Sequence, residues 1–255
     1  LSEPDRHGFC TLGPSVDTAL AAVQSADVVI AEINKQMPRT HGSGFVHLNQ
    51  LDAFVRTDYP LSTANHGRGG AAEEAIGAII ADLIQDGSTL QMGIGAIPDA
   101  VLARLTDKAD LGIHTEMFSD GLVPLVEAGV VNNSRKNVHR GRIVTSFVSG
   151  SQTVLDFIND NPMCEFHPCN YTNDTALIRR HDRMVAINSA LEIDLTGQVC
   201  ADSIGHRVYS GIGGQMDFIR GAALAREGKA IIALPATARK GTVSRITPTL
   251  KAGAG

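Results

Sequence analysis

The chain has 255 residues, of which 43% are hydrophobic and 19% are charged, so it can bury a sizeable core and is not an intrinsically disordered protein. The net charge is −5 and no lysine or arginine run is longer than two residues, which excludes the basic surface of a nucleic-acid or anionic-membrane binder. Apolar stretches are far shorter than the 18 or so residues that a membrane span needs, so no membrane partner is expected.

The first segments mix helix and strand patterns. Residues 15–26 are predicted to form a helix, because their apolar side chains are spaced by four and three. Residues 26–33 are short, β-branched and apolar on both faces, which is typical of a buried parallel strand. Residues 61–70 contain three glycines and no periodicity, so we expect a domain boundary there that separates residues 1–65 from residues 66–255.

The clearest helix signal covers residues 71–85, whose predicted buried stripe is Ala72, Ile76, Ile79, Ile80 and Leu83. Strand and helix patterns then alternate regularly. Strands are expected at 89–94, 111–115, 143–148, 184–193 and 229–234, and helices at 98–105, 122–128, 153–158 and 215–226. This alternation indicates an α/β protein with mostly parallel sheets, in which ligands bind at the carboxyl ends of the strands.

The first candidate site is the segment Gln91-Met-Gly-Ile-Gly-Ala-Ile-Pro98. A strand here runs into Gly93 and Gly95 and then into a helix whose first position is Pro98. Backbone N–H groups at such a helix start can hold a phosphate or a developing oxyanion. An ordinary tight turn between a strand and a helix has the same pattern, so the spacing alone leaves both interpretations open.

The second candidate is Glu116, at the carboxyl end of the next predicted strand. Sequential parallel strands usually pair, which would place this carboxylate beside the glycine loop. A helix-capping or surface role is the plainer alternative. A further alternative is a dinucleotide site, because Glu116 lies 21 residues after Gly95 and an acidic residue at about that distance binds the ribose in such folds. The third glycine of that fingerprint is replaced by Pro98, however.

The third candidate is the segment from Tyr209 to Phe218, where three glycines again precede a predicted helix. Two glycine loops of this kind suit a long ligand with phosphates at one end and a reacting group at the other. Neither loop has the phosphate-binding pattern of nucleoside triphosphatases, so that class is not expected.

Other candidates are weaker. Cys164, His167 and Cys169 lie close in sequence but lack zinc-site spacing, so no metal is expected. His114 shares the strand face of Glu116 but could equally be structural, and Arg39 could bind a carboxylate or be an ordinary surface residue. The four cysteines are too irregularly spaced for a disulfide framework, which favours a reducing, cytoplasmic location.

Taken together, several segments resemble the acetyl-CoA hydrolase/transferase family, and in particular its 4-hydroxybutyrate and butyrate–acetate CoA-transferase branch. The resemblance covers nearly the whole chain. The segments that carry it begin at Pro4, Gln36, Gln91, Gly112, Asn188, Ser210 and Ser244.

The resemblance implies two related α/β domains with the active site in the cleft between them. It assigns the nucleophile to Glu116 and a coenzyme A loop to Gln91, Met92, Gly93, Ile94 and Gly95, with further coenzyme A contacts at Leu191, Gly214 and Lys240. It also implies a homodimer, coenzyme A and acyl-CoA as substrates, and no permanently bound cofactor. Family members are longer at both ends, so we expect this chain to be a fragment.

The implied reaction is a ping-pong transfer of coenzyme A from an acyl-CoA to a short-chain carboxylate through a glutamyl-CoA thioester on Glu116. If water captured the intermediate, the same residues would form a hydrolase. A dinucleotide-dependent oxidoreductase and a non-catalytic coenzyme A-binding module are the other hypotheses.

Overall fold

A four-stranded, wholly parallel sheet lies at the centre of the larger part of the molecule. The computed structural model describes residues 1–64, 69–93 and 95–254. The sheet has the order β17-β12-β6-β7, with β6 at Thr89–Met92, β7 at Gly112–Ile113, β12 at Met184–Ser189 and β17 at Lys229–Ala233. The expected pairing of the two sequential strands β6 and β7 is confirmed.

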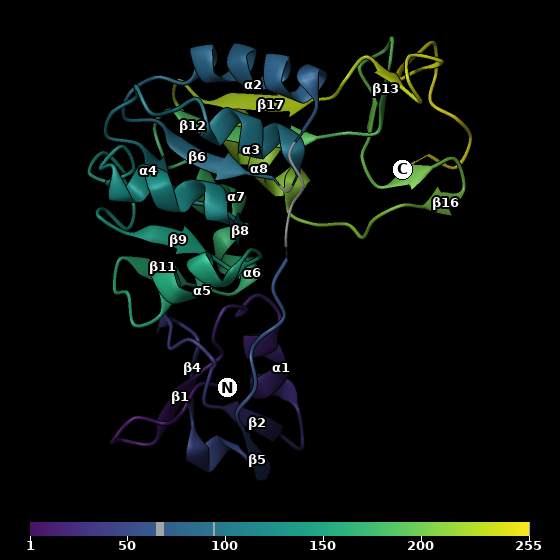
Figure 1. Ribbon diagram of the computed structural model, residues 1–255. Helices are drawn as coiled ribbons and strands as arrows, with labels where there is room; N and C mark the ends of the chain where they lie inside the picture. The colour runs from purple at the N-terminus through teal and green to yellow at the C-terminus, as the bar shows by residue number, and fades with distance from the viewer. Residues whose placement is uncertain (65–68, 94, 255) are drawn as a thin grey trace.

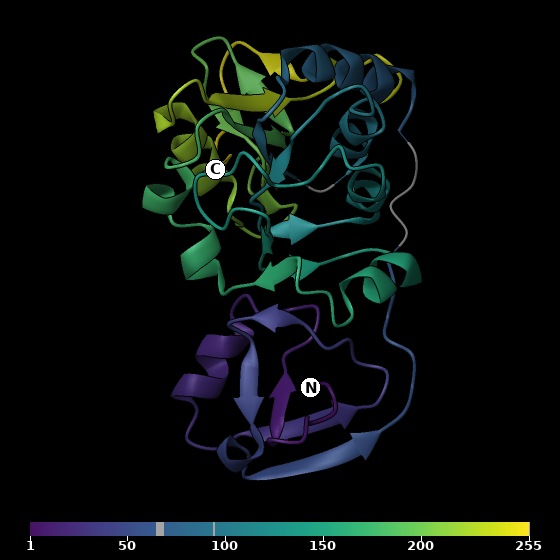
Figure 2. The same cartoon turned by 90° about the vertical axis from the view of Figure 1, so that its left-hand side faces the viewer.

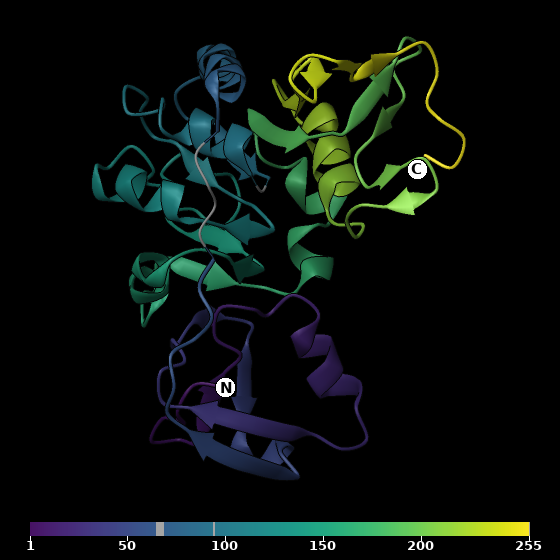
Figure 3. The same cartoon turned by 45° about the vertical axis from the view of Figure 1, so that its right-hand side comes forward.

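Helices cover both faces of this sheet, and β12 shows why. Its side chains alternate, so that Val185 and Ile187 join the core on the side of α2 and α3, whereas Met184 and Ala186 pack with Phe218 of α8 on the other side. Figure 3 shows the blue helices α2 and α3 well apart from the yellow-green α8. The helices are α2 (Ala71–Leu83), α3 (Ala96–Leu102), α7 (Thr175–Ile178) and α8 (Gln215–Leu224).

The parallel arrangement continues beyond β7. A bridge between His114 and Val144 leads to β9 (Ile143–Thr145), which pairs with β11 (Cys164–Phe166), and β11 pairs in turn with β3 (His41–Gly42). Because β3 belongs to the N-terminal region, the two parts of the chain share one ladder of backbone hydrogen bonds.

The N-terminal region lies at one end of the molecule (Figure 2). It contains an antiparallel pair, β1 (Phe9–Thr11) with β4 (Phe45–His47), a parallel pair, β2 (Ile30–Asn34) with β5 (Ala53–Thr57), and the helix α1 (Ala19–Ser25). A single 3₁₀ turn, η1 (Leu48–Gln50), precedes β5. The proposed domain division near residue 65 stays a prediction.

The buried strand expected at residues 26–33 was wrong in two respects. The strand β2 starts at Ile30 and not at residue 26. Ile30 is 73% exposed and Val28 is 62% exposed. Within the described residues β2 pairs only with β5, and the apolar side chains on one face of this pair, Val55 among them, have no covering layer. Apolar residues on both faces of a strand therefore did not mean burial on both faces.

The helix α2 is confirmed, and its predicted stripe was correct only in part. Ile80 is buried and Ile76 packs against the core, whereas Ala72 is exposed and Ile79 and Leu83 are 65% and 45% exposed. The buried residues of the helix are Gly77, Ile80 and Ala81. A Cβ atom on Gly77 would lie 2.8 Å from the backbone of Ala100. The small residues allow the two helix backbones to approach closely, and this contact decided the orientation of α2.

Shorter elements complete the fold, and Figure 1 shows β13 and β16 set apart from the central sheet. They are β8 (Met117–Phe118), η2 (Asp120–Leu122), α4 (Val123–Glu127), β10 (Phe147–Val148), α5 (Gln152–Ile158), α6 (Cys169–Thr172), β13 (Glu192–Asp194), β14 (Val199–Cys200), β15 (Ser203–Ile204), β16 (Arg207–Val208), β18 (Thr237–Ala238), β19 (Val243–Ser244) and β20 (Ile246–Thr247). The expected fold class, α/β with mostly parallel sheets, is confirmed. No helix in the described part of the chain is long and apolar enough to cross a membrane.

Candidate active site

Glu116 lies at a break between the strands β7 and β8. Its carbonyl oxygen accepts hydrogen bonds from the backbone N–H groups of Ser146 (2.9 Å) and Phe147 (3.0 Å) and from the Thr145 hydroxyl (3.0 Å). Three donors on one carbonyl fix the backbone of Glu116 firmly against the neighbouring chain. The Glu116 side chain therefore extends from a fixed backbone, and a reacting group needs such fixed positioning.

The first turn of α8 faces the Glu116 carboxylate. The backbone N–H of Gly214 donates to Oε2 of Glu116 at 2.9 Å, and Gly214 is the residue that caps the start of α8. A Cβ atom at Gly214 would lie 2.5 Å from both this Oε2 and Nδ2 of Asn173. Only glycine allows the helix start to approach the carboxylate this closely.

Glu116 opens into a cavity of about 610 Å³. The segments around the two glycine loops meet there, together with the carboxyl end of β12 and the residues after it. The lining residues are Gln91, Met92, Gly93, Glu116, Met117, Phe147, Asn188, Ser189, Ala190, Leu191, Ala201, Tyr209, Ser210, Gly211, Gly213, Gly214 and Gln215. Six of the residues predicted for the site are thus brought together: Glu116, Gln91, Met92, Gly93, Leu191 and Gly214.

The glycine pattern predicted free backbone N–H groups after β6, but the N–H group of Gly93 is already hydrogen-bonded within the sheet. The N–H of Gly93 donates to the carbonyl of Ile187 at 2.9 Å, so it is not a free donor for an oxyanion. The Gln91 and Asn188 side chains instead form an amide pair, at 2.9 and 3.3 Å, in the cavity wall. Each amide NH₂ group uses one hydrogen in this pair and keeps a second one for another acceptor.

Asn188 was not among the predicted site residues. It lies near the carboxyl end of β12, the strand beside β6, so the rule that ligands bind at adjacent carboxyl strand ends could have found it.

Two predicted residues, Gly95 and Lys240, do not line the cavity. Gly95 caps α3 with a positive φ of 119°, which suits glycine, and no atom lies within 4 Å of the position of its Cβ. Lys240 is exposed in the turn between β18 and β19. Ile94 lies outside the described residues.

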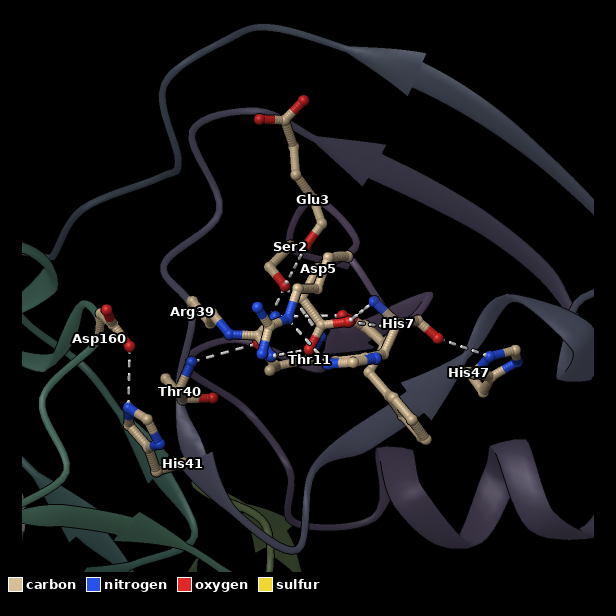
Figure 4. A network of polar contacts seen from close by, with 12 residues as sticks. Ser2, Glu3, Asp5, His7, Thr11, Arg39, Thr40, His41, His47 and Asp160 are labelled. Carbon is tan, nitrogen blue, oxygen red and sulfur yellow. Dashed lines mark hydrogen bonds and ion pairs between the residues drawn. The ribbon is translucent and has the colours of Figure 1, made fainter.

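Arg39 is held within the N-terminal region (Figure 4). Its guanidinium donates to Oδ2 of Asp5 at 2.9 Å and to the carbonyl oxygen of Phe9 at 3.1 Å. Near it, Nε2 of His41 forms a hydrogen bond with Oδ1 of Asp160 at 3.1 Å across the join between the two parts of the chain. The carboxylate partner of Arg39 is therefore a residue of the protein itself.

His114 is fully buried behind the site. Its Nε2 hydrogen-bonds the carbonyl oxygen of Thr172 at 2.8 Å, and its ring packs against His181, with ring centroids 5.0 Å apart, and against Phe218 of α8. Burial lowers the pKa of His114 well below its usual value and lowers the pKa of His181 to about 3. Both rings are therefore neutral, and the structural interpretation of His114 is the one that fits.

The cysteines near His167 do not assemble with it into a group of metal-binding atoms. Cys164 is buried, and burial raises the pKa of its thiol to about 12. His139 and Glu165 are the residues that lie beside His167.

The fold and the cavity define an α/β protein with a cavity at the carboxyl ends of parallel strands, beside a carboxylate. Comparison with known proteins agrees with this class. The acetyl-CoA hydrolase/transferase N-terminal domain matches residues 1–62, and the C-terminal domain of the same description matches residues 150–255. The chain belongs to the acetyl-CoA hydrolase/transferase family.

Among similar proteins, 4-hydroxybutyrate coenzyme A transferase of Clostridium kluyveri is 53% identical over 254 residues, covering 100% of this chain and 59% of that protein. Succinyl-CoA:acetate/propanoyl-CoA:succinate CoA transferase of Fasciola hepatica is 46% identical, covering 100% and 54%. The crystal structure of 4-hydroxybutyrate CoA-transferase from Porphyromonas gingivalis superposes with a TM-score of 0.90 at 44% identity, covering 99% of this chain and 61% of that one. The chain therefore spans somewhat more than half the length of these relatives.

Proposed function

We propose that the protein to which this chain belongs transfers coenzyme A from an acyl-CoA to a short-chain carboxylate, with Glu116 as the nucleophile. The observation that carries the proposal is the position of Glu116. It lines the cavity, and its carboxylate accepts a hydrogen bond from the N–H group of Gly214, the N-cap residue of α8. Gln91, Met92 and Gly93 line the same cavity, which supports their predicted role in binding coenzyme A. Relatives named as 4-hydroxybutyrate and butyryl-CoA:acetate CoA transferases support the substrate class.

In the proposed reaction, a carboxylate oxygen of Glu116 attacks the thioester carbonyl of the acyl-CoA. The C–S bond breaks, which gives a mixed anhydride and coenzyme A thiolate. The thiolate then attacks the glutamyl carbonyl of the anhydride and releases the first carboxylate, leaving a glutamyl-CoA thioester. An acceptor carboxylate repeats these steps in reverse order, and Glu116 is regenerated.

The chain supplies groups suited to these steps. The second amide hydrogens of Gln91 and Asn188 are donors in the cavity wall for a developing oxyanion. A carboxylate is a weak nucleophile, so the fixed backbone of Glu116 contributes to the rate through positioning. The proposed chemistry uses coenzyme A only as substrate and takes place in a cytoplasmic homodimer.

The test is to incubate the protein expressed from its complete gene with an acyl-CoA and to reduce the mixture with borohydride. Peptide mass spectrometry is expected to find the modification on the peptide that contains Glu116, and none in the Glu116→Gln variant. Turnover without any modification of Glu116 would contradict the proposal. A non-catalytic coenzyme A-binding module would bind coenzyme A without exchanging it between carboxylates.

A second candidate function is acyl-CoA hydrolysis by the same glutamate. It is favoured by the similarity to acetyl-CoA hydrolase of Kluyveromyces lactis, which is 31% identical over 140 residues. Measuring free coenzyme A with and without added acetate, butyrate or 4-hydroxybutyrate separates the two functions. A transferase forms the new acyl-CoA, whereas a hydrolase releases coenzyme A at a rate independent of acceptor. Binding of NAD(H) in place of coenzyme A would instead support the oxidoreductase hypothesis.

A further inference from the structure

Two histidines and a glutamate meet where the N-terminal region joins the rest of the molecule. Nδ1 of His139 lies 2.5 Å from Oε2 of Glu165, and Nε2 of His167 lies 3.4 Å from the same oxygen. All three ligand atoms lie within 4.8 Å of one another. Glu165 is in β11, the strand that pairs with β3 of the N-terminal region.

The outer nitrogen of each imidazole is held by a hydroxyl group. Nε2 of His139 lies 2.5 Å from the Tyr171 hydroxyl, and Nδ1 of His167 lies 2.8 Å from the Ser43 hydroxyl. When these hydroxyls accept hydrogen bonds from the rings, the lone pairs of the two inner nitrogens both point toward Glu165. Oxygen acceptors behind metal-binding histidines commonly fix the tautomer in this way.

The carboxylate of Glu165 is oriented as well. Nε of Arg142 lies 3.5 Å from Oε1, whereas both histidines face Oε2. One oxygen is therefore neutralised by the arginine and the other is presented to the imidazoles. Side-chain exposures of 21% for His139, 23% for Glu165 and 12% for His167 leave the group within reach of ions from solvent.

We propose that His139, Glu165 and His167 form a binding site for a late first-row divalent cation, of which Zn²⁺ is the probe of choice. Two imidazoles and one carboxylate are ligands that Zn²⁺ accepts, with water in the fourth position. Tetrahedral zinc with bonds of about 2.0–2.1 Å separates its ligand atoms by about 3.4 Å. Glu165 and His167 already have this separation, and the His139 ring has to withdraw by about 0.9 Å.

The site was not visible in the sequence, because His139 lies 26 residues before Glu165 and none of the usual zinc spacings connects them. A bound cation would tie the loop that carries His139 to β11, and through Ser43 to the N-terminal region. It lies apart from the residues that line the cavity beside Glu116 and does not depend on the proposed transfer reaction.

The test is a zinc titration of the 255-residue chain in competition with a chromophoric chelator. One tight site per chain is expected. His139→Ala and His167→Ala are each expected to raise the dissociation constant by at least about 100-fold, and Tyr171→Phe, which removes only the outer hydroxyl, by about 10-fold. His206→Ala, at an exposed histidine outside the group, is the matched control and is expected to change nothing.

Cobalt substitution provides a second readout on the unaltered protein. Bound Co²⁺ is expected to show visible d–d absorption without the intense near-ultraviolet band of a cobalt–thiolate bond, because no cysteine belongs to the group. Absence of a tight site in the unaltered chain would overturn the proposal. Zinc binding that survives in the double variant His139→Ala/His167→Ala, or that is lost in Cys169→Ser, would overturn it equally.

Discussion

Substitution of Gly214 by alanine tests whether the close approach of α8 positions Glu116. The new Cβ would lie 2.5 Å from Oε2 of Glu116, whereas an ordinary contact begins near 3.4 Å, so the carboxylate or the helix start has to move by about 0.9 Å. Misplacing a reacting group by about 1 Å costs on the order of 100-fold in rate, or about 3 kcal/mol of transition-state stabilisation. We therefore expect kcat of Gly214→Ala to fall by about 100-fold.

The assay measures acyl-CoA formation from an added carboxylate, with unfolding followed separately in urea. The free energy of unfolding is expected to fall by only about 1 kcal/mol, because one hydrogen bond is lost at the edge of a cavity. Gly211→Ala is the matched control, since it lies in the same loop and no atom lies within 4 Å of its Cβ position. Its effect on kcat is expected to be at most a few-fold.

A double-variant cycle sharpens the test. Glu116→Asp shortens the side chain and moves the carboxylate away from Gly214, so the Cβ of Gly214→Ala clashes with it less. The loss of kcat caused by Gly214→Ala should therefore be clearly smaller in the aspartate variant than in the unaltered protein. Equal losses in both backgrounds would refute the steric reasoning. So would a Gly214→Ala protein that retains full activity.

Three further predictions concern stability. Thr115→Val keeps the shape of a fully buried side chain but removes a hydroxyl that bonds three backbone groups, so we expect a loss of about 1–3 kcal/mol in urea unfolding. The pKa of His181 is lowered to about 3, so below pH 6.5 the unfolded chain takes up a proton that the folded chain does not, and stability should fall by about 2 kcal/mol between pH 6.5 and 5. His181→Leu should make the unfolding midpoint less dependent on pH over this range, and an unchanged dependence would contradict the assignment. Gly77→Ala places a Cβ 2.8 Å from the backbone of Ala100 and should lower the melting temperature, whereas a neutral result would show that α2 and α3 can separate at little cost.

The order of strands and helices was predictable because each later element carries its own periodicity. The strands β6, β12 and β17 and the helices α2 and α8 all fall within the ranges expected from the sequence. The sequence could not show which apolar face of a strand or helix packs against another element. Ile30 in β2 and Ile79 in α2 have the same hydrophobicity as core residues, yet each is exposed, because burial depends on long-range packing.

The site was predictable to a similar extent. Glu116 and the glycine loops could be selected as candidates because local sequence places them at strand ends, and parallel strands meet at one edge. The pairing of Gln91 with Asn188, which are 97 residues apart, depends on which strands become neighbours. The use of the Gly93 N–H within the sheet and the exposed position of Lys240 depend on the same tertiary detail.

The ladder that runs from β17 through β7 and β9 to β3 restricts the motions open to the molecule. A hinge between the N-terminal region and the rest would have to break the parallel hydrogen bonds between β3 and β11 and the hydrogen bond of His41 with Asp160. The loop over residues 209–214 is mostly exposed, borders the cavity and lies outside this ladder. A movement of this loop would change access to the cavity without breaking any hydrogen bond of the ladder.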